Sequence, residues 1–229
     1  MKPQELRNAR LTKGWGQTEA AARLGVSQAY VNMLERGKRS VTPRMMRKFV
    51  QVYSLSPEAL PVSETFAKNA DPGHLAEYLA KLGYPGFAYL RTHVAKKNPM
   101  EVLLLALKQD RLEARIAEAL PWVPLNFWQG GSAWLVEQAR KLNLQNRLGF
   151  VVSLARQVSE RNSQNDQRKH ALRELQTALE ESRLAKEDAF YRPPRTPGER
   201  QWLLQNRPEE ARHWNLLADL RPEQIQYVG

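Results

Sequence analysis

The hydrophobic and polar positions of the chain follow short helical periods for most of its length. Apolar residues recur three or four positions apart, and glycine, proline or asparagine separates one such segment from the next. No segment shows the strict two-residue alternation that is typical of a half-buried strand. The pattern therefore predicts an all-α protein, with a five-helix N-terminal domain and a larger C-terminal helical domain.

The N-terminal quarter of the chain has the pattern of short helices joined by tight turns. A helix is predicted over residues 17–24, and residues 25–27 form the turn that follows it. Ser27 is suited to cap the next helix, residues 28–36, because its hydroxyl can accept a hydrogen bond from a free backbone N–H. Gly37 suits the left-handed position that commonly ends a helix.

Residues 61–71 are the predicted linker between a first domain, residues 1–60, and a second domain, residues 72–229. A long polar helix is predicted over about residues 167–190, although its apolar spacing fails at Ser182. The other helices expected in the second domain are those of residues 75–82, 100–108, 111–120, 133–142 and 145–161.

Lysine and arginine outnumber aspartate and glutamate by 35 to 24, which gives a net charge of +11. The excess is concentrated near the N-terminus. Residues 1–60 hold 11 basic and 4 acidic residues, a net charge of +7, whereas residues 163–229 are neutral. A concentrated positive charge favours a polyanionic partner, most often nucleic acid.

The chain contains no cysteine, and no apolar run approaches the roughly 18 residues of a membrane span. We therefore expect a soluble, cytoplasmic protein with no membrane partner. Phosphate-binding, metalloprotease and nucleophile motifs are missing from the sequence. We expect no cofactor, no catalytic residue and no metal, since metal-ligand spacing is lacking among the four histidines, His74, His93, His170 and His213.

The residues around the first predicted turn form one helix-turn-helix pattern, which runs Gln17-x3-Ala21-x2-Leu24-Gly25-Val26-Ser27-x3-Val31-x2-Leu34-Glu35-x-Gly37-Lys38-Arg39. This pattern resembles the Cro/phage-repressor (Xre-like) helix-turn-helix family, and the resemblance extends over about residues 4–60. One departure is Gly16, which stands at the cap site where the family usually has threonine or serine. No family is recognised for the rest of the chain.

The resemblance implies that the helix of residues 28–36 lies in the major groove of DNA, with its N-terminal part against base edges. Gln28 can form two hydrogen bonds with adenine, whereas Ala29 and Met33 offer only apolar contacts. Arg10 and Glu35 match a structural ion pair of the family. The implied DNA-binding residues are Gln17, Ser27, Gln28, Ala29, Tyr30, Asn32, Met33, Lys38, Arg39 and Arg44.

These features predict a sequence-specific DNA-binding transcriptional regulator, namely a dimeric repressor that reads a palindromic operator with residues 28–36. One recognition helix contacts few base pairs, so the C-terminal domain is expected to form a homodimer and to bind a small-molecule effector or a protein partner. One alternative is an antitoxin, in which that domain neutralises a toxin and DNA binding serves autoregulation. Another is an enzyme with a DNA-binding appendage, which the missing catalytic motifs disfavour.

Two groups of residues in the second domain keep alternative interpretations. The tryptophan-rich segment 122–134 is expected mainly in the core, with a partner or ligand surface as the alternative. Arg140, Lys141 and Arg147 are expected on a solvated face, with an extension of the DNA contact surface as the alternative.

Overall fold

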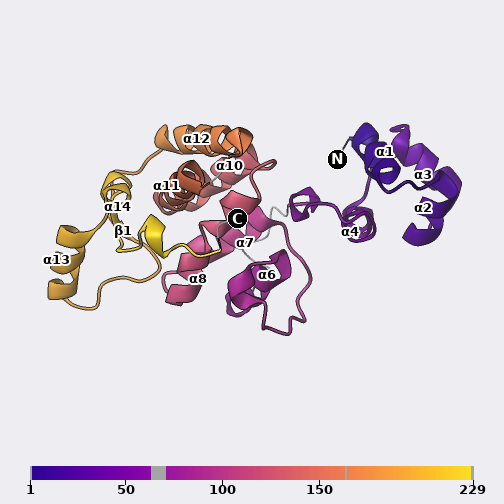
Figure 1. Cartoon of the computed structure of the whole chain (residues 1–229). Coiled ribbons are helices and arrows are strands. Elements are labelled where there is room, and N and C mark those ends of the chain that lie inside the picture. Colours follow the sequence, from indigo (N-terminus) through magenta and orange to yellow (C-terminus); the bar gives the residue numbers. More distant parts are fainter. Residues whose placement is uncertain (1, 63–70, 163, 228–229) are drawn as a thin grey trace. The chain divides into compact units, whose positions relative to one another are not determined.

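The computed structural model describes residues 2–62, 71–162 and 164–227. Backbone contacts divide the chain into two compact units, Met1–Val62 and Ser63–Gly229. Helices make up nearly all of the regular structure of both units (Figure 1), so the prediction of an all-α protein is confirmed. Most of the predicted linker, residues 61–71, lies outside the described residues.

The first unit contains the five helical elements that the sequence predicts, although the last is a single 3-10 turn. Proline opens three of them, at a position where its missing N–H has no partner to lose. Thr42 caps the fourth helix by accepting a hydrogen bond from the Met45 N–H at 3.2 Å. The elements are α1 Pro3–Thr12, α2 Gln17–Leu24, α3 Gln28–Glu35, α4 Pro43–Val52 and the 3-10 helix Pro57–Ala59.

The core of the first unit takes an apolar face from each of its α-helices. The half-buried Trp15 packs on its edge against Tyr53, with the two ring centroids 5.6 Å apart. Because α2 contributes two alanines, α2 and α3 can approach each other closely. The core side chains are Leu6, Ala20, Ala21, Leu24, Val31, Leu34, Phe49 and Tyr53.

The second unit is an array of helices around two central ones. Every residue of α7, Pro99–Leu107, is buried, and all of them except Glu101 are apolar, as expected of a helix packed on all sides. The longer α11, Gln145–Asn162, packs against several neighbours, among them α12. The remaining helices are α6 Leu75–Leu82, α8 Ala114–Ala119, α9 Trp122–Asn126, α10 Ser132–Leu142, α12 Asp166–Glu180, α13 Pro197–Asn206 and α14 Glu209–His213, with 3-10 turns at Pro72–His74, Pro85–Phe87 and Pro222–Gln224.

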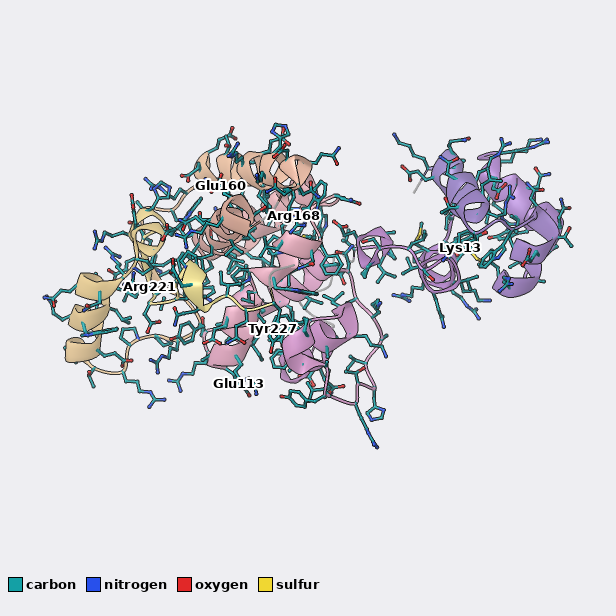
Figure 2. The ribbon with its side chains drawn as sticks, in the orientation of Figure 1. Lys13, Glu113, Glu160, Arg168, Arg221 and Tyr227 are labelled. Carbon is teal, nitrogen blue, oxygen red and sulfur yellow. The ribbon has the colours of Figure 1, made fainter. Side chains whose placement is uncertain are left out.

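Ion pairs tie α11 to its neighbours. Glu160 of α11 (Figure 2) accepts hydrogen bonds from Arg156 of the same helix and from Arg173 of α12. Burial raises the pKa of the Glu160 carboxyl, but these two guanidinium groups outweigh burial and hold the pKa below its ordinary value. Within the described ranges, no helix combines the length and the apolar character that crossing a bilayer requires.

The prediction of a helix over about residues 167–190 is wrong beyond Glu180, where α12 ends. The backbone of Leu184 is held instead by Asn146 of α11, whose side-chain amide donates to its carbonyl at 2.8 Å and accepts from its N–H at 2.9 Å. The chain then forms β1, Asp188–Ala189, which pairs in parallel with β2, Leu216–Leu217. Two-residue strands are too short to show the alternation by which strands are recognised.

The predicted helix of residues 111–120 is also shorter than expected, because it starts only at Ala114. The backbone N–H of Leu112 donates to the Tyr191 carbonyl at 2.7 Å and is therefore held outside the helix. By contrast, the boundaries of residues 75–82 are confirmed. The left-handed Gly83, with φ of 102°, ends this helix.

Trp214 joins α14 to α11 at the centre of the second unit. Its side chain is fully buried and lies directly over Gly149 of α11, where a Cβ atom would stand 2.4 Å from the indole ring. The indole N–H donates to the Ser153 hydroxyl at 2.8 Å. The absence of a side chain at residue 149 is therefore what lets the tryptophan reach the helix backbone.

Candidate nucleic-acid interface

Gly25 and Ser27 build the turn between α2 and α3. Gly25 ends α2 with a left-handed φ of 63°, a conformation that glycine adopts at little cost. Ser27 then caps α3, since its hydroxyl accepts a hydrogen bond from the Tyr30 N–H at 3.2 Å. Gly16 is the residue before α2, where it offers no side-chain cap. Gly25 and Ser27 therefore mark the end of α2 and the start of α3 by their own chemistry.

Burial of one face of α3 decides which of its residues face outward. Val31 and Leu34 are each 1% exposed and point into the core. Ser27, Gln28 and Ala29 are consequently exposed at the start of the helix. Farther along, the half-buried side chains are Tyr30, Asn32 and Met33. The start of α3 is thus its most accessible part.

A chain of hydrogen-bonded side chains connects the exposed Gln28 with the interior. The Gln28 amide donates to the Gln17 Oε1 at 2.9 Å, and the Gln17 amide donates to the Glu35 Oε2 at 3.0 Å. Glu35 in turn receives Arg10, which also donates to the Trp15 carbonyl at 2.7 Å. We call Gln28, Gln17, Glu35 and Arg10 the polar chain. It restricts the rotamers of an otherwise free surface glutamine.

Arg10 and Glu35 form the buried end of the polar chain. The guanidinium Nε lies 2.6 Å from Oε1 of the carboxylate and Nη2 lies 2.9 Å from Oε2, a two-pronged geometry that favours strong pairing. Their side chains are only 8% and 4% exposed. Burial raises the pKa of Glu35, but hydrogen bonds from Arg10 and Gln17 outweigh it and lower the pKa. Both groups are therefore charged at neutral pH.

The buried pair also affects its aromatic neighbour Tyr53. Burial, with the negative charge of Glu35 as a smaller cause, raises the pKa of the Tyr53 hydroxyl to about 12. Tyr53 therefore stays neutral at any physiological pH, and the charges in this core are those of Arg10 and Glu35.

Basic side chains surround the end of α3. Lys38, Arg39 and Arg44 are exposed, and within the described residues none of them takes part in an ion pair. The Arg39 guanidinium lies 5.1 Å from the centre of the Tyr30 ring, within the range of a cation–π contact. These three cations are free to contact an external anion such as a phosphate.

Sequence reasoning missed a contribution of Lys48 to this unit. Its ammonium group donates to the Leu24 carbonyl at 3.1 Å, at the C-terminal end of α2. A cation there satisfies a carbonyl that lacks a partner in the helix and interacts favourably with the helix dipole. The contact joins α4 to α2, which are far apart in the sequence, so no local motif predicts it.

The tryptophan-rich segment 122–134 and Arg147, whose roles the sequence left open, differ in how deeply they are buried. Trp122 and Phe127 are buried in the core, whereas Trp128 and Trp134 are half-buried. Arg147 is not on a solvated face, because it is buried and its guanidinium binds Asp188 at 2.7 Å and the Leu107 carbonyl at 2.9 Å. Arg147 therefore belongs neither to a solvated face nor to an extension of the DNA contact surface.

Arg140 and Lys141, the other two basic residues with an open interpretation, lie in exposed ion pairs. Arg140 lies 3.7 Å from Glu181, and Lys141 lies 2.6 Å from Glu137. Three of the histidines have a carboxylate neighbour, namely His74, His170 and His213. In the described part of the chain, no three histidine or acidic side chains come together as a metal ion would require.

A comparison with known protein families finds a match on the first unit. Residues 6–60 match the model of a protein family described as Helix-turn-helix. No curated protein and no solved structure matches the chain. The matched residues include α2, the turn, α3 and all four residues of the polar chain. Residues 6–60 are therefore a helix-turn-helix domain of the Cro/phage-repressor type, the DNA-binding domain of a transcription regulator.

Proposed function

We propose that the protein is a repressor that binds a palindromic operator as a homodimer and reads the base sequence with α3. The observation that carries this proposal is the exposed start of α3, where Gln28 is oriented by Gln17. The resemblance to phage repressors supports the direction of regulation. The net charge of +7 over residues 1–60 supports a polyanionic partner.

Gln28 is suited to read adenine in the geometry that the polar chain gives it. One hydrogen of its amide nitrogen is used in the bond to Gln17. The second hydrogen and the Oε1 atom remain available to bind DNA. Those two groups are the donor and acceptor that pair with N7 and N6 of adenine in the major groove. Lys38, Arg39 and Arg44 would contact phosphates, which position the domain without selecting a sequence.

The proposed dimer follows from the small number of base pairs that one α3 can contact. Two copies on a two-fold symmetric site would place the half-site centres about 34 Å apart, one turn of the duplex. We expect footprinting with the full chain to show two symmetric protected half-sites on one face of the DNA. Protection of one asymmetric half-site by a monomer would contradict the proposal. Repression is tested by placing that site in a reporter promoter and measuring transcription with and without the protein.

Two classes of substitution should have different effects on DNA binding. Gln28→Ala should remove a contact worth about 1–3 kcal/mol at one base pair and relax the preference there. Lys38→Ala should weaken binding to all sequences alike and reduce the slope of log affinity against log salt by about one unit. Both effects are measured in one titration series over salt concentration and over single-base operator variants.

The matched control for this series is Gln51→Ala, because Gln51 is also an exposed helical glutamine but lies in α4. It should change neither the affinity nor the base preference. If Gln28→Ala lowers the affinity equally for every operator variant, Gln28 contacts only the DNA backbone. The base-reading residues would then be sought among Ala29, Asn32 and Met33.

A further inference from the structure

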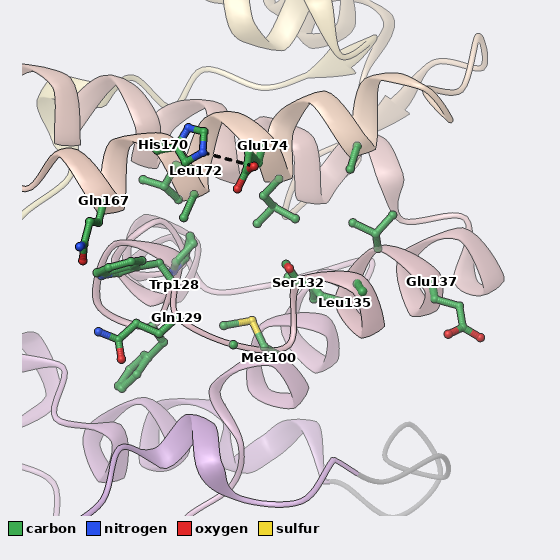
Figure 3. Close-up of a pocket in the computed structure, with 18 of the residues that line it drawn as sticks. Met100, Trp128, Gln129, Ser132, Leu135, Glu137, Gln167, His170, Leu172 and Glu174 are labelled. Carbon is green, nitrogen blue, oxygen red and sulfur yellow. Dashed lines mark ion pairs between the residues drawn. The ribbon is translucent and has the colours of Figure 1, made fainter. Parts of the chain in front are cut away.

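The second unit contains a cavity of about 870 Å³ between α10 and α12 (Figure 3). One wall is α12, and the opposite wall is α10 with the segment that precedes it. Sites for small molecules in proteins usually have about 300–1,000 Å³ and a mainly apolar lining. The buried side chains that line this cavity are all apolar, namely Met100, Pro124, Phe127, Leu135, Val136, Leu172 and Leu175.

A few uncharged polar groups face this apolar lining. Trp128, Ser132 and Gln167 border the cavity from the segment before α10, from its first turn and from α12 (Figure 3). Within the described residues, no hydrogen bond involves the Trp128 indole N–H, the Ser132 hydroxyl or the Gln167 amide. A mainly apolar site with a small number of free donors and acceptors is what orients a bound organic molecule.

The charged residues of the lining disfavour an anionic ligand. Arg140 is its one arginine or lysine among the described residues, and the Ala178 carbonyl already accepts from this guanidinium at 3.2 Å. Two carboxylates also line the cavity, but Glu137 and Glu174 are 60% and 68% exposed. A charged group placed in the buried part would lose its hydration without gaining a partner of opposite charge.

We propose that this cavity binds an uncharged, largely apolar small molecule, whose body lies between α10 and α12 and whose polar group faces Trp128. The site concerns the second unit alone and goes beyond the proposed binding of DNA. The failure of either proposal would leave the other standing, because the cavity and α3 belong to different units.

The full chain is tested with N-phenyl-1-naphthylamine, an uncharged probe whose fluorescence rises in an apolar site. We expect a saturable rise with one site per chain. Ala171 is a half-buried residue of the cavity wall, so Ala171→Trp should fill the space and weaken binding by about tenfold or more. The matched control is Ala95→Trp, at an exposed alanine outside the cavity, which should leave binding unchanged.

The charge preference is tested with the sulfonated probe 1-anilinonaphthalene-8-sulfonate, which should bind more weakly than the uncharged one. Tighter binding of the sulfonate would overturn the assignment of an uncharged ligand. Absence of saturable binding, or equal binding by Ala171→Trp and the unchanged chain, would overturn the site itself. Circular dichroism checks that each variant is folded. If Ala171→Trp does not fold, Ala178→Trp, at a half-buried alanine also on α12, takes its place.

Discussion

Glu35→Ala should lower the free energy of unfolding of the first unit by about 3–5 kcal/mol, because it leaves Arg10 buried without its partner. The expected loss is large because the two side chains are 8% and 4% exposed and share two hydrogen bonds. A domain of this size has a stability of only about 3–9 kcal/mol. Hydrogen exchange of the α1–α3 amides in the full chain measures the loss directly.

The matched control is Glu19→Ala, which breaks the exposed pair between Glu19 and Arg23 on α2. Exposed pairs contribute at most about 1 kcal/mol, so amide protection should change little. Equal effects of Glu19→Ala and Glu35→Ala would show that the pair of Arg10 and Glu35 is open to water.

The lowered pKa of Glu35 adds a pH dependence to the same experiment. Its contribution to stability is complete above the pKa of an unfolded glutamate and is lost as the pH falls through the lower pKa of the folded state. The free energy of unfolding should therefore decrease from about pH 6 down to about pH 3, and this decrease should be smaller in Glu35→Gln. An identical pH profile for both proteins would contradict the role of this carboxylate.

Trp214→Ala should destabilise the second unit by about 3–5 kcal/mol, the usual cost of removing a large buried aromatic side chain. The indole is fully buried, and its N–H bond to Ser153 is lost as well. Thermal or denaturant unfolding of the full chain measures the change. Trp202→Ala is the matched control, because Trp202 is 51% exposed on α13 and its removal should cost far less.

A double-mutant cycle with Gly149 tests the cause of this effect. Gly149→Ala alone should cost about 1–3 kcal/mol, since the added Cβ would stand 2.4 Å from the Trp214 ring. The same substitution should be nearly neutral when Trp214 is already alanine, because the clash is then absent. Additive costs in the double variant would show that residue 149 acts through something other than the tryptophan.

The first unit could be predicted closely from the sequence because its signals are local. Ser27, Gly25 and the prolines mark helix ends by their own chemistry, and the spacing of Val31 and Leu34 fixes which face of α3 is exposed. The contact of Lys48 with α2 could not be predicted, since it joins residues that no periodicity relates.

The second unit shows where such prediction ends. The course of the chain after Glu180 is set by Asn146 and Arg147, which hold Leu184 and Asp188 from a distant helix. Both residues are polar, so a hydrophobic pattern assigns them to the surface. The cavity between α10 and α12 likewise depends on how two helices pack, which the sequence of either helix does not contain.

The polar chain limits how this protein could be retargeted to a new operator. A library that varies residue 28 alone would leave the Gln17 oxygen without the donor that now satisfies it, and the new side chain would lack an anchor. If Gln28 reads the operator as proposed, residues 17 and 28 are therefore best varied together. Glu35 should be left unchanged in such a library, because the same carboxylate accepts a hydrogen bond from Gln17 and pairs with the buried Arg10.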